Sequence, residues 1–127
     1  MGSKEGTVSA TYAVGQRDDR PWGHWEILAV GPGYAVKRIL VRAGGRLSLQ
    51  RHVHRAEHWI IVSGSGKVTR GDEVVPVAAG QHVLIGLGDA HRIENPGTED
   101  LLFIEVQLGQ HLDESDIERL QDDYGRS

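Results

Sequence analysis

The chain contains no cysteine among its 127 residues. This absence excludes disulfide bonds, thiolate metal ligands and a cysteine nucleophile, so histidine, carboxylate or amide groups must hold any metal ion. No apolar run approaches the roughly 20 residues of a membrane-spanning helix, and no charged-then-apolar signal peptide opens the chain. We therefore expect a soluble, cytoplasmic protein with no membrane partner.

An excess of basic residues, which nucleic-acid binding favours, is also missing. The 14 Lys and Arg residues are outnumbered by 18 Asp and Glu residues, which gives a net charge of −4. We therefore expect no nucleic-acid partner. The length fits one domain, and we assign residues 1–19 to a polar N-terminal tail and residues 20–127 to that domain.

Helical periodicity is absent from most of the chain. Short runs that mix apolar and polar residues are separated by Gly, Pro or Asp at intervals of roughly 8 to 12 residues, a pattern typical of a β-sandwich or barrel. The 17 glycines suit the tight corners of such a fold. One segment with an acidic first turn, Asp113–Leu120, predicts a short helix near the C-terminus. The sequence therefore predicts an all-β domain with one short C-terminal helix.

Two glycine-bounded motifs carry the chemistry. The first spans residues 44–64 and has the spacing of two strands joined by a turn, while the second spans residues 80–95. Together they supply four nitrogen or oxygen donors: Gln50, His52, Glu57 and His91. Four such donors brought together would form a divalent-metal site.

A second ligand set is compatible with the same region. It replaces the amide with further nitrogen donors and consists of His52, His54 and His91 with Glu57 or His58. Donor type favours this second set for a transition metal, because an amide oxygen is a weak ligand. Spacing favours the set with Gln50, because a leading pair of His52 and His54 leaves only two residues before Glu57 for the turn. Strand alternation then places His54 on the same face as Gln50 and His52.

The two motifs resemble the paired signature of the cupin superfamily, with Gln50 in place of its usual first histidine and Gly86 in place of its usual proline. The closer resemblance is to the C-terminal cupin domain of type II phosphomannose isomerases, which is usually fused to a mannose-1-phosphate guanylyltransferase. The matching elements run in family order over about residues 18–126: RPWG (Arg20–Gly23), VKRI (Val36–Ile39), LSLQ (Leu47–Gln50), HRAEHW (His54–Trp59), HRIENPG (His91–Gly97), IEVQLG (Ile104–Gly109) and DIERLQDDYGR (Asp116–Arg126).

This resemblance implies a double-stranded β-helix, that is, a cupin or jelly-roll barrel. It implies interconversion of mannose 6-phosphate and fructose 6-phosphate, so that the partner would be a small sugar phosphate. It also implies one divalent ion, with zinc first and manganese, cobalt or nickel as alternatives, held by Gln50, His52, Glu57 and His91. No nucleotide-binding signature such as GGxGTRLWP occurs, so we expect no guanylyltransferase activity.

The matched elements also contain candidate residues for catalysis and substrate binding. We expect His54 to move the substrate proton, because histidine titrates near neutral pH, with Arg55 and Lys37 as further catalytic residues. Residues with hydroxyl or cationic side chains are expected to bind the substrate: Ser48, Arg38, Arg92 and Arg126. Strand alternation turns Arg92 away from the cavity unless a bulge reorients it.

Two other functions compete with that of a stand-alone isomerase. One is a non-catalytic metal-binding cupin module that binds a sugar or sugar phosphate. The other is a different cupin enzyme, such as a dioxygenase, another sugar isomerase or an epimerase. Oxygen donors from Gln50 and Glu57 favour Lewis-acid chemistry over redox chemistry, which counts against a dioxygenase. We also expect a homodimer, because small barrels expose edge strands that need covering.

Overall fold

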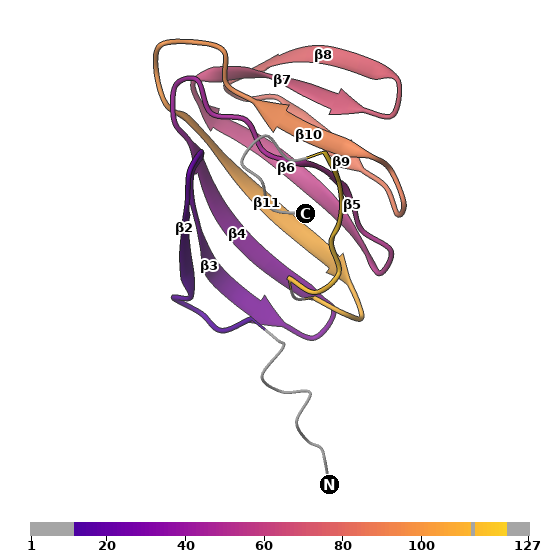
Figure 1. The fold of residues 1–127 in the computed structure, drawn as a ribbon. Helices are drawn as coiled ribbons and strands as arrows, with labels where there is room; N and C mark the ends of the chain where they lie inside the picture. Colours follow the sequence, from indigo (N-terminus) through magenta and orange to yellow (C-terminus); the bar gives the residue numbers. More distant parts are fainter. Residues whose placement is uncertain (1–11, 113, 122–127) are drawn as a thin grey trace, which may run out of the picture.

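The computed structural model describes residues 12–112 and 114–121. They form two antiparallel sheets that lie face to face (Figure 1). The six-stranded sheet contains, in spatial order, β2 (Arg17–Arg20), β3 (Gly23–Gly31), β4 (Tyr34–Val41), β11 (Leu101–Gly109), β6 (Arg55–Ser63) and β9 (His82–Ile85). The five-stranded sheet contains β12 (Glu118–Gln121), β5 (Leu49–Arg51), β10 (His91–Glu94), β7 (Ser65–Arg70) and β8 (Glu73–Ala78).

The interior between the sheets changes from apolar to polar along the central strand β11. Strand alternation turns Leu101 and Phe103 inward, and both are fully buried in the hydrophobic core. The next two residues on the same inward face are Glu105 and Gln107, which are also buried. A run of buried polar side chains on one strand needs partners inside the fold, so the polar end of β11 marks a candidate site.

The helix predicted from Asp113 to Leu120 is wrong for the described residues. The chain turns through residues 114–116, and β12 then pairs with the edge of β5. Acidic side chains of the segment predicted to be helical instead bond to residues that are distant in the sequence and close in space. Asp116 accepts hydrogen bonds from two backbone N–H groups, and Glu118 pairs with Arg51 at 2.7 Å. No helix long and apolar enough to cross a membrane occurs in residues 12–112 and 114–121.

Candidate metal centre

Three donors converge at the polar end of the barrel interior. His52 follows β5, Glu57 lies in β6 and His91 opens β10, so both sheets contribute to the cluster. One ligand atom from each residue lies within 4.8 Å of the others, and all three residues are buried. The carboxylate is central, because Glu57 Oε2 is 3.1 Å from His52 Nε2 and Glu57 Oε1 is 3.9 Å from His91 Nε2.

Backbone carbonyl groups orient both imidazole rings toward Glu57. His52 Nδ1 lies 2.6 Å from the carbonyl oxygen of Asp116, and His91 Nδ1 lies 2.9 Å from that of Asp89. A carbonyl oxygen can only accept, so Nδ1 carries a proton in both rings and Nε2 is the atom that faces the cluster. In the metal-free protein a second proton on His52 Nε2 is donated to Glu57, and a bound cation would take the place of that proton. A ring with Nε2 free for the cation is the form that a metal-binding histidine needs, so the three residues fit a divalent cation.

The surroundings of Glu57 keep its carboxyl group ionised. Burial alone would raise its pKa, but the hydrogen bond to His52 and the charge of Arg55 hold that pKa well below its usual value. Arg55 Nε donates to Oε2 at 2.9 Å, and Trp59 Nε1 donates to Oε1 at 2.9 Å. Burial acts to lower the pKa of both histidines. At His52 the hydrogen bond and charge of Glu57 outweigh burial, so its pKa is raised. At His91 burial is the larger effect, so its pKa is lowered. The cluster therefore presents a carboxylate between two imidazoles.

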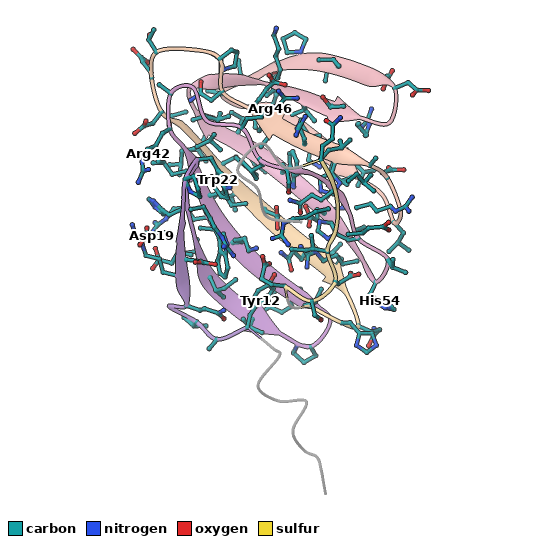
Figure 2. The ribbon with its side chains drawn as sticks, viewed as in Figure 1. Tyr12, Asp19, Trp22, Arg42, Arg46 and His54 are labelled. Atoms are coloured by element: carbon teal, nitrogen blue, oxygen red, sulfur yellow. The ribbon has the colours of Figure 1, made fainter. Side chains whose placement is uncertain are left out.

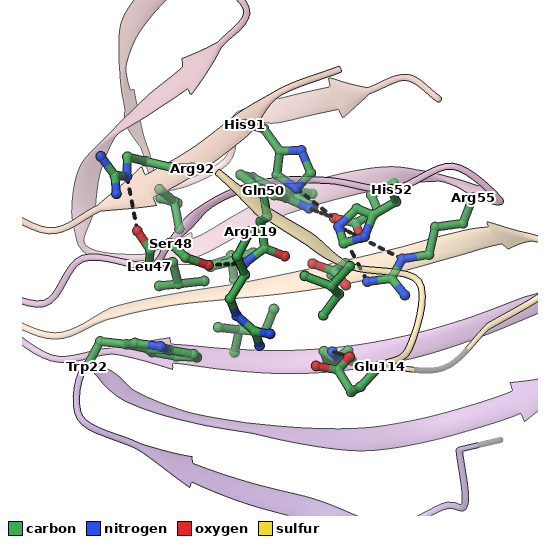
Figure 3. A pocket seen from close by; sticks show the side chains of 18 residues that line it. Trp22, Leu47, Ser48, Gln50, His52, Arg55, His91, Arg92, Glu114 and Arg119 are labelled. Carbon is green, nitrogen blue, oxygen red and sulfur yellow. Dashed lines mark hydrogen bonds and ion pairs between the residues drawn. The ribbon is translucent and has the colours of Figure 1, made fainter. Parts of the chain in front are cut away.

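Gln50, the expected fourth ligand, lies beside the cluster (Figure 3). It is the direct cross-strand partner of His91 in the ladder between β5 and β10. Its Nε2 donates to the hydroxyl oxygen of Ser48 at 2.7 Å, and Ser48 is fully buried. The amide is thus tethered at the edge of the site, and its coordination of a metal remains a prediction.

Replacing His52 by alanine should weaken zinc binding by more than the roughly 10- to 100-fold loss that outer-shell partners typically cause, because one of three converging donors is removed. The matched control is His54→Ala, which changes a nearby histidine outside the cluster. A competition titration against a chromophoric chelator measures both affinities. Equal zinc affinities for the two variants would contradict this metal centre.

The second ligand set is not brought together. The strand β5 ends at Arg51 and the chain then bends, so the alternation that placed His54 on the ligand face does not continue. His54 is exposed at the rim of the molecule, where its ring contacts His111 at 4.8 Å between centroids (Figure 2). His58 also lies away from the cluster, with its Nδ1 2.9 Å from His82 Nε2. The expectation that His54 faces the site is therefore wrong.

The metal cluster lines a cavity that is open to solvent. The space inside it that the centre of a water-sized sphere can occupy is about 50 Å³, so the cavity is narrow. Four other residues expected to act on the substrate line the same cavity: Lys37, Ser48, Arg55 and Arg92. Arg38 does not, because it lies on the opposite face of β4 and pairs with Glu26 at 2.7 Å. Arg126 lies outside the described residues.

Two of the cations in the cavity form ion pairs within it. Lys37 Nζ lies 2.9 Å from Glu114 Oε2 and 4.2 Å from the ring centre of Trp25. Arg55 Nε lies 2.9 Å from Glu57 Oε2, and both side chains are buried. These pairs compensate charge inside the barrel, so Arg55 directly supports the carboxylate of the candidate metal centre.

Arg92 departs from the strand alternation. It is buried together with both of its neighbours in β10, and it lines the cavity instead of turning away from it. Its Nε donates to the carbonyl oxygen of Leu47 at 3.0 Å, and its Nη1 donates to Gln121 Oε1 at 3.2 Å (Figure 3). The segment before β5 and the strand β12, both on the β5 side of β10, therefore bury this guanidinium group, and the expected outward orientation is wrong.

Glu105 and Glu114 line the cavity but are not among the site residues predicted from the sequence. Burial and the charge of Glu57 raise the pKa of Glu105 to about 7. The sequence does show that Glu105 and Gln107 alternate with apolar residues in β11. In an antiparallel strand with this alternation the polar residues normally face water, so the pattern does not predict that they line a cavity. Glu114 lies in the segment expected to be helical, so its position beside Lys37 could not be anticipated.

Comparison with known proteins reveals long matches. Residues 9–122 match the model of the family described as mannose-6-phosphate isomerase C-terminal. The chain is 53% identical over 108 residues to the xanthan biosynthesis protein XanB of Xanthomonas campestris pv. campestris (strain B100), covering 85% of this chain and 23% of that protein. It is 46% identical over 107 residues to the mannose-1-phosphate guanylyltransferase ManC of Salmonella typhimurium (strain LT2), covering 84% and 22%. The chain therefore spans less than a quarter of the length of these relatives.

The fold also has solved counterparts. The structure of Rru_A2000 from Rhodospirillum rubrum, described as a cupin-2 domain, superimposes with a TM-score of 0.64 and 27% sequence identity over 73% of this chain and 67% of that chain. This similarity and the two facing antiparallel sheets confirm the all-β cupin barrel expected from the sequence.

Proposed function

Because the chain belongs to the mannose-6-phosphate isomerase C-terminal family, we propose that it is a metal-dependent isomerase that interconverts mannose 6-phosphate and fructose 6-phosphate. The observation that carries this proposal is the convergence of His52, Glu57 and His91 inside a solvent-open cavity. The relatives are several times longer than the chain and contain much that it lacks. We therefore propose the isomerase reaction for the cavity of this domain alone.

The donor set supports a divalent ion, with zinc first and manganese, cobalt or nickel as alternatives. Buried imidazole nitrogen and carboxylate oxygen are common zinc ligands, and Gln50 would complete a set of four. When bound, the ion would polarise the sugar carbonyl and stabilise the negative charge that develops on its oxygen.

The cationic walls of the cavity support recognition of a phosphorylated sugar. Charge-assisted hydrogen bonds from Arg or Lys are a strong means of binding phosphate. In this proposal Arg92 and Ser48, which are separated from the metal cluster by Gln50, bind the phosphate group. Lys37 and Arg55 flank the reacting end of the sugar next to Glu57.

The test is a coupled assay for fructose 6-phosphate formed from mannose 6-phosphate. Protein stripped with a chelator is reloaded separately with Zn²⁺, Mn²⁺, Co²⁺ or Ni²⁺. We expect turnover only with a metal, and loss of that turnover in His52→Ala. A protein that binds a metal tightly but converts no substrate with any of the four ions would contradict the proposal.

One observation favours a second candidate, a metal-binding cupin module that binds a sugar phosphate without converting it. His54 and Arg38, which were expected to act on the substrate, lie outside the cavity. Calorimetric binding of mannose 6-phosphate by the zinc-loaded protein, without turnover, would support this module and exclude the isomerase.

The proposal includes three expectations about the protein as a whole. We propose a cytoplasmic homodimer in which residues 20–127 form the cupin domain and residues 1–19 its N-terminal arm. Exposed apolar side chains on the outer face of the six-stranded sheet support self-association: Ile60, Val62, Leu84 and Leu108. We propose no nucleic-acid partner, in keeping with the negative net charge.

A further inference from the structure

With His54 outside the cavity, the proton transfer of an isomerase needs another group. Three residues that line the cavity carry carboxyl groups: Glu57, Glu105 and Glu114. Glu57 belongs to the metal cluster. Glu114 is paired with Lys37 at 2.9 Å, and that charge counters the effect of burial and lowers the pKa of Glu114 to about 2, so it is a weak base. Glu105 is the carboxyl group that neither the cluster nor this ion pair employs.

The sheet places Glu105 next to the metal cluster without making it a ligand. In the ladder between β11 and β6, Glu105 is the partner of Trp59, and Gln107 is the partner of Glu57. Glu105 and Glu57 are therefore diagonal neighbours on one inward face, with Cα atoms roughly 7 to 8 Å apart. Both carboxyl groups line the same cavity, so a sugar bound at the cluster would have Glu105 on the adjoining wall.

The groups that face Glu105 come from every strand packed against it. Lys37 is its cross-strand partner in β4, Arg55 and Glu57 come from β6, and Gln107 Nε2 donates to its Oε2 at 2.6 Å. Burial and the Glu57 charge favour the protonated carboxyl, whereas Lys37, Arg55 and the Gln107 hydrogen bond favour the carboxylate. Glu105 thus lines the cavity beside the cluster, with one amide donor bonded to its carboxyl group and a lysine as its cross-strand partner, which is the placement that a proton-transfer group needs.

We propose that Glu105 is the catalytic residue that carries the proton between C2 and C1 of the sugar, an inference that rests on the proposed isomerase function. Starting from mannose 6-phosphate, the Glu105 carboxylate takes the proton from C2. The electron pair of that C–H bond forms the C1=C2 double bond, and the π pair of the C1 carbonyl moves to its oxygen, which takes a proton from water at the open mouth of the cavity. The C2 hydroxyl then returns one proton to water, its O–H electron pair forms the C2 carbonyl, and the C1=C2 π pair takes the proton back from Glu105 at C1, so that the one proton gained at the C1 oxygen and the one lost from the C2 oxygen balance. Substrate and product are isomers, so no oxidant or reductant is needed.

The direct test compares Glu105→Gln and Glu105→Asp with Glu99→Gln, a control that changes an exposed carboxylate outside the lining of the cavity. We expect Glu105→Gln to lower kcat by about 100- to 10,000-fold, the usual contribution of acid–base catalysis, with KM and zinc affinity within about threefold of wild type. Glu105→Asp should retain more activity than Glu105→Gln, because it keeps the carboxyl group. Glu99→Gln should behave as wild type.

A second measurement does not depend on the folding of a Glu105 variant. Gln107→Met removes the hydrogen bond that favours the Glu105 carboxylate, so the acid limb of the kcat profile should move to higher pH. A kcat for Glu105→Gln within about threefold of wild type, or an acid limb that does not rise in Gln107→Met, would overturn the role of Glu105 alone. A wild-type protein that is inactive with every metal would overturn the proposed function and this inference together.

Discussion

Replacing Glu57 by glutamine is expected to abolish metal binding and to lower the free energy of unfolding of the metal-free protein by about 3 to 5 kcal/mol. The carboxylate compensates the buried guanidinium group of Arg55 at 2.9 Å and accepts a hydrogen bond from Trp59. Glutamine keeps the shape but not the charge, so Arg55 would be left buried with less compensation. Denaturant unfolding of the chelator-treated protein measures the loss.

The control for this prediction removes both charges. In the double variant Glu57→Gln with Arg55→Gln, no guanidinium group remains to be compensated, so part of the lost stability should return. Additive losses in the double variant would show that the two side chains do not act as a pair, and would contradict this account.

Replacing Glu105 by glutamine is expected to have the opposite effect on stability. The pKa of Glu105 rises from 4.5 to about 7 in the folded protein, so between these pH values the unfolded chain loses a proton that the folded chain keeps. The wild-type free energy of unfolding therefore falls as pH rises through this window, by roughly 3 kcal/mol at 1.36 kcal/mol per pKa unit. A glutamine side chain at this position does not titrate, so Glu105→Gln should gain stability over wild type from pH 5 to pH 8.

Glu114 supplies a matched control of opposite sign in the same cavity. Its pKa is lowered to about 2, so its ion pair with Lys37 stabilises the protein above the ordinary carboxyl range. Glu114→Gln should therefore destabilise the metal-free protein near neutral pH, and the difference from wild type should shrink as pH falls from about 4.5 toward 2. A stability difference between Glu105→Gln and wild type that does not change from pH 5 to pH 8 would contradict the buried, protonated carboxyl.

If Glu105 also carries the substrate proton, one substitution should raise stability and remove turnover together. A buried carboxyl group whose pKa is raised toward neutral pH lowers the free energy of unfolding, and such a loss of stability is common at active sites. The two readouts are independent, because stability is measured without metal and turnover is measured with it.

The strand content was predictable because it follows from local patterns. Alternating short runs and glycine-rich turns predicted an all-β fold, and motif spacing predicted that His52, Glu57 and His91 would come together. The predicted C-terminal helix failed because segment 114–121 is shaped by long-range contacts. Asp116 bonds to the backbone more than 60 residues away, and Glu118 bonds to Arg51.

The orientations of individual side chains were less predictable. Strand alternation holds only while the strand continues, and β5 ends before His54, which therefore faces outward. Arg92 is buried because neighbouring segments bond to its guanidinium group, and local sequence does not reveal those segments. Glu105 was overlooked because a polar residue in an amphipathic strand normally faces water, whereas here the polar side lines a cavity.

The hydrogen bond between His52 and the carbonyl oxygen of Asp116 joins residues that are 64 positions apart. The orientation of this ring is therefore linked to the docking of segment 114–121 against β5. A change that detaches this segment would remove the acceptor at His52 Nδ1 without altering any of the converging donors. Affinity for an ion would then report on the position of a segment that contributes no ligand itself.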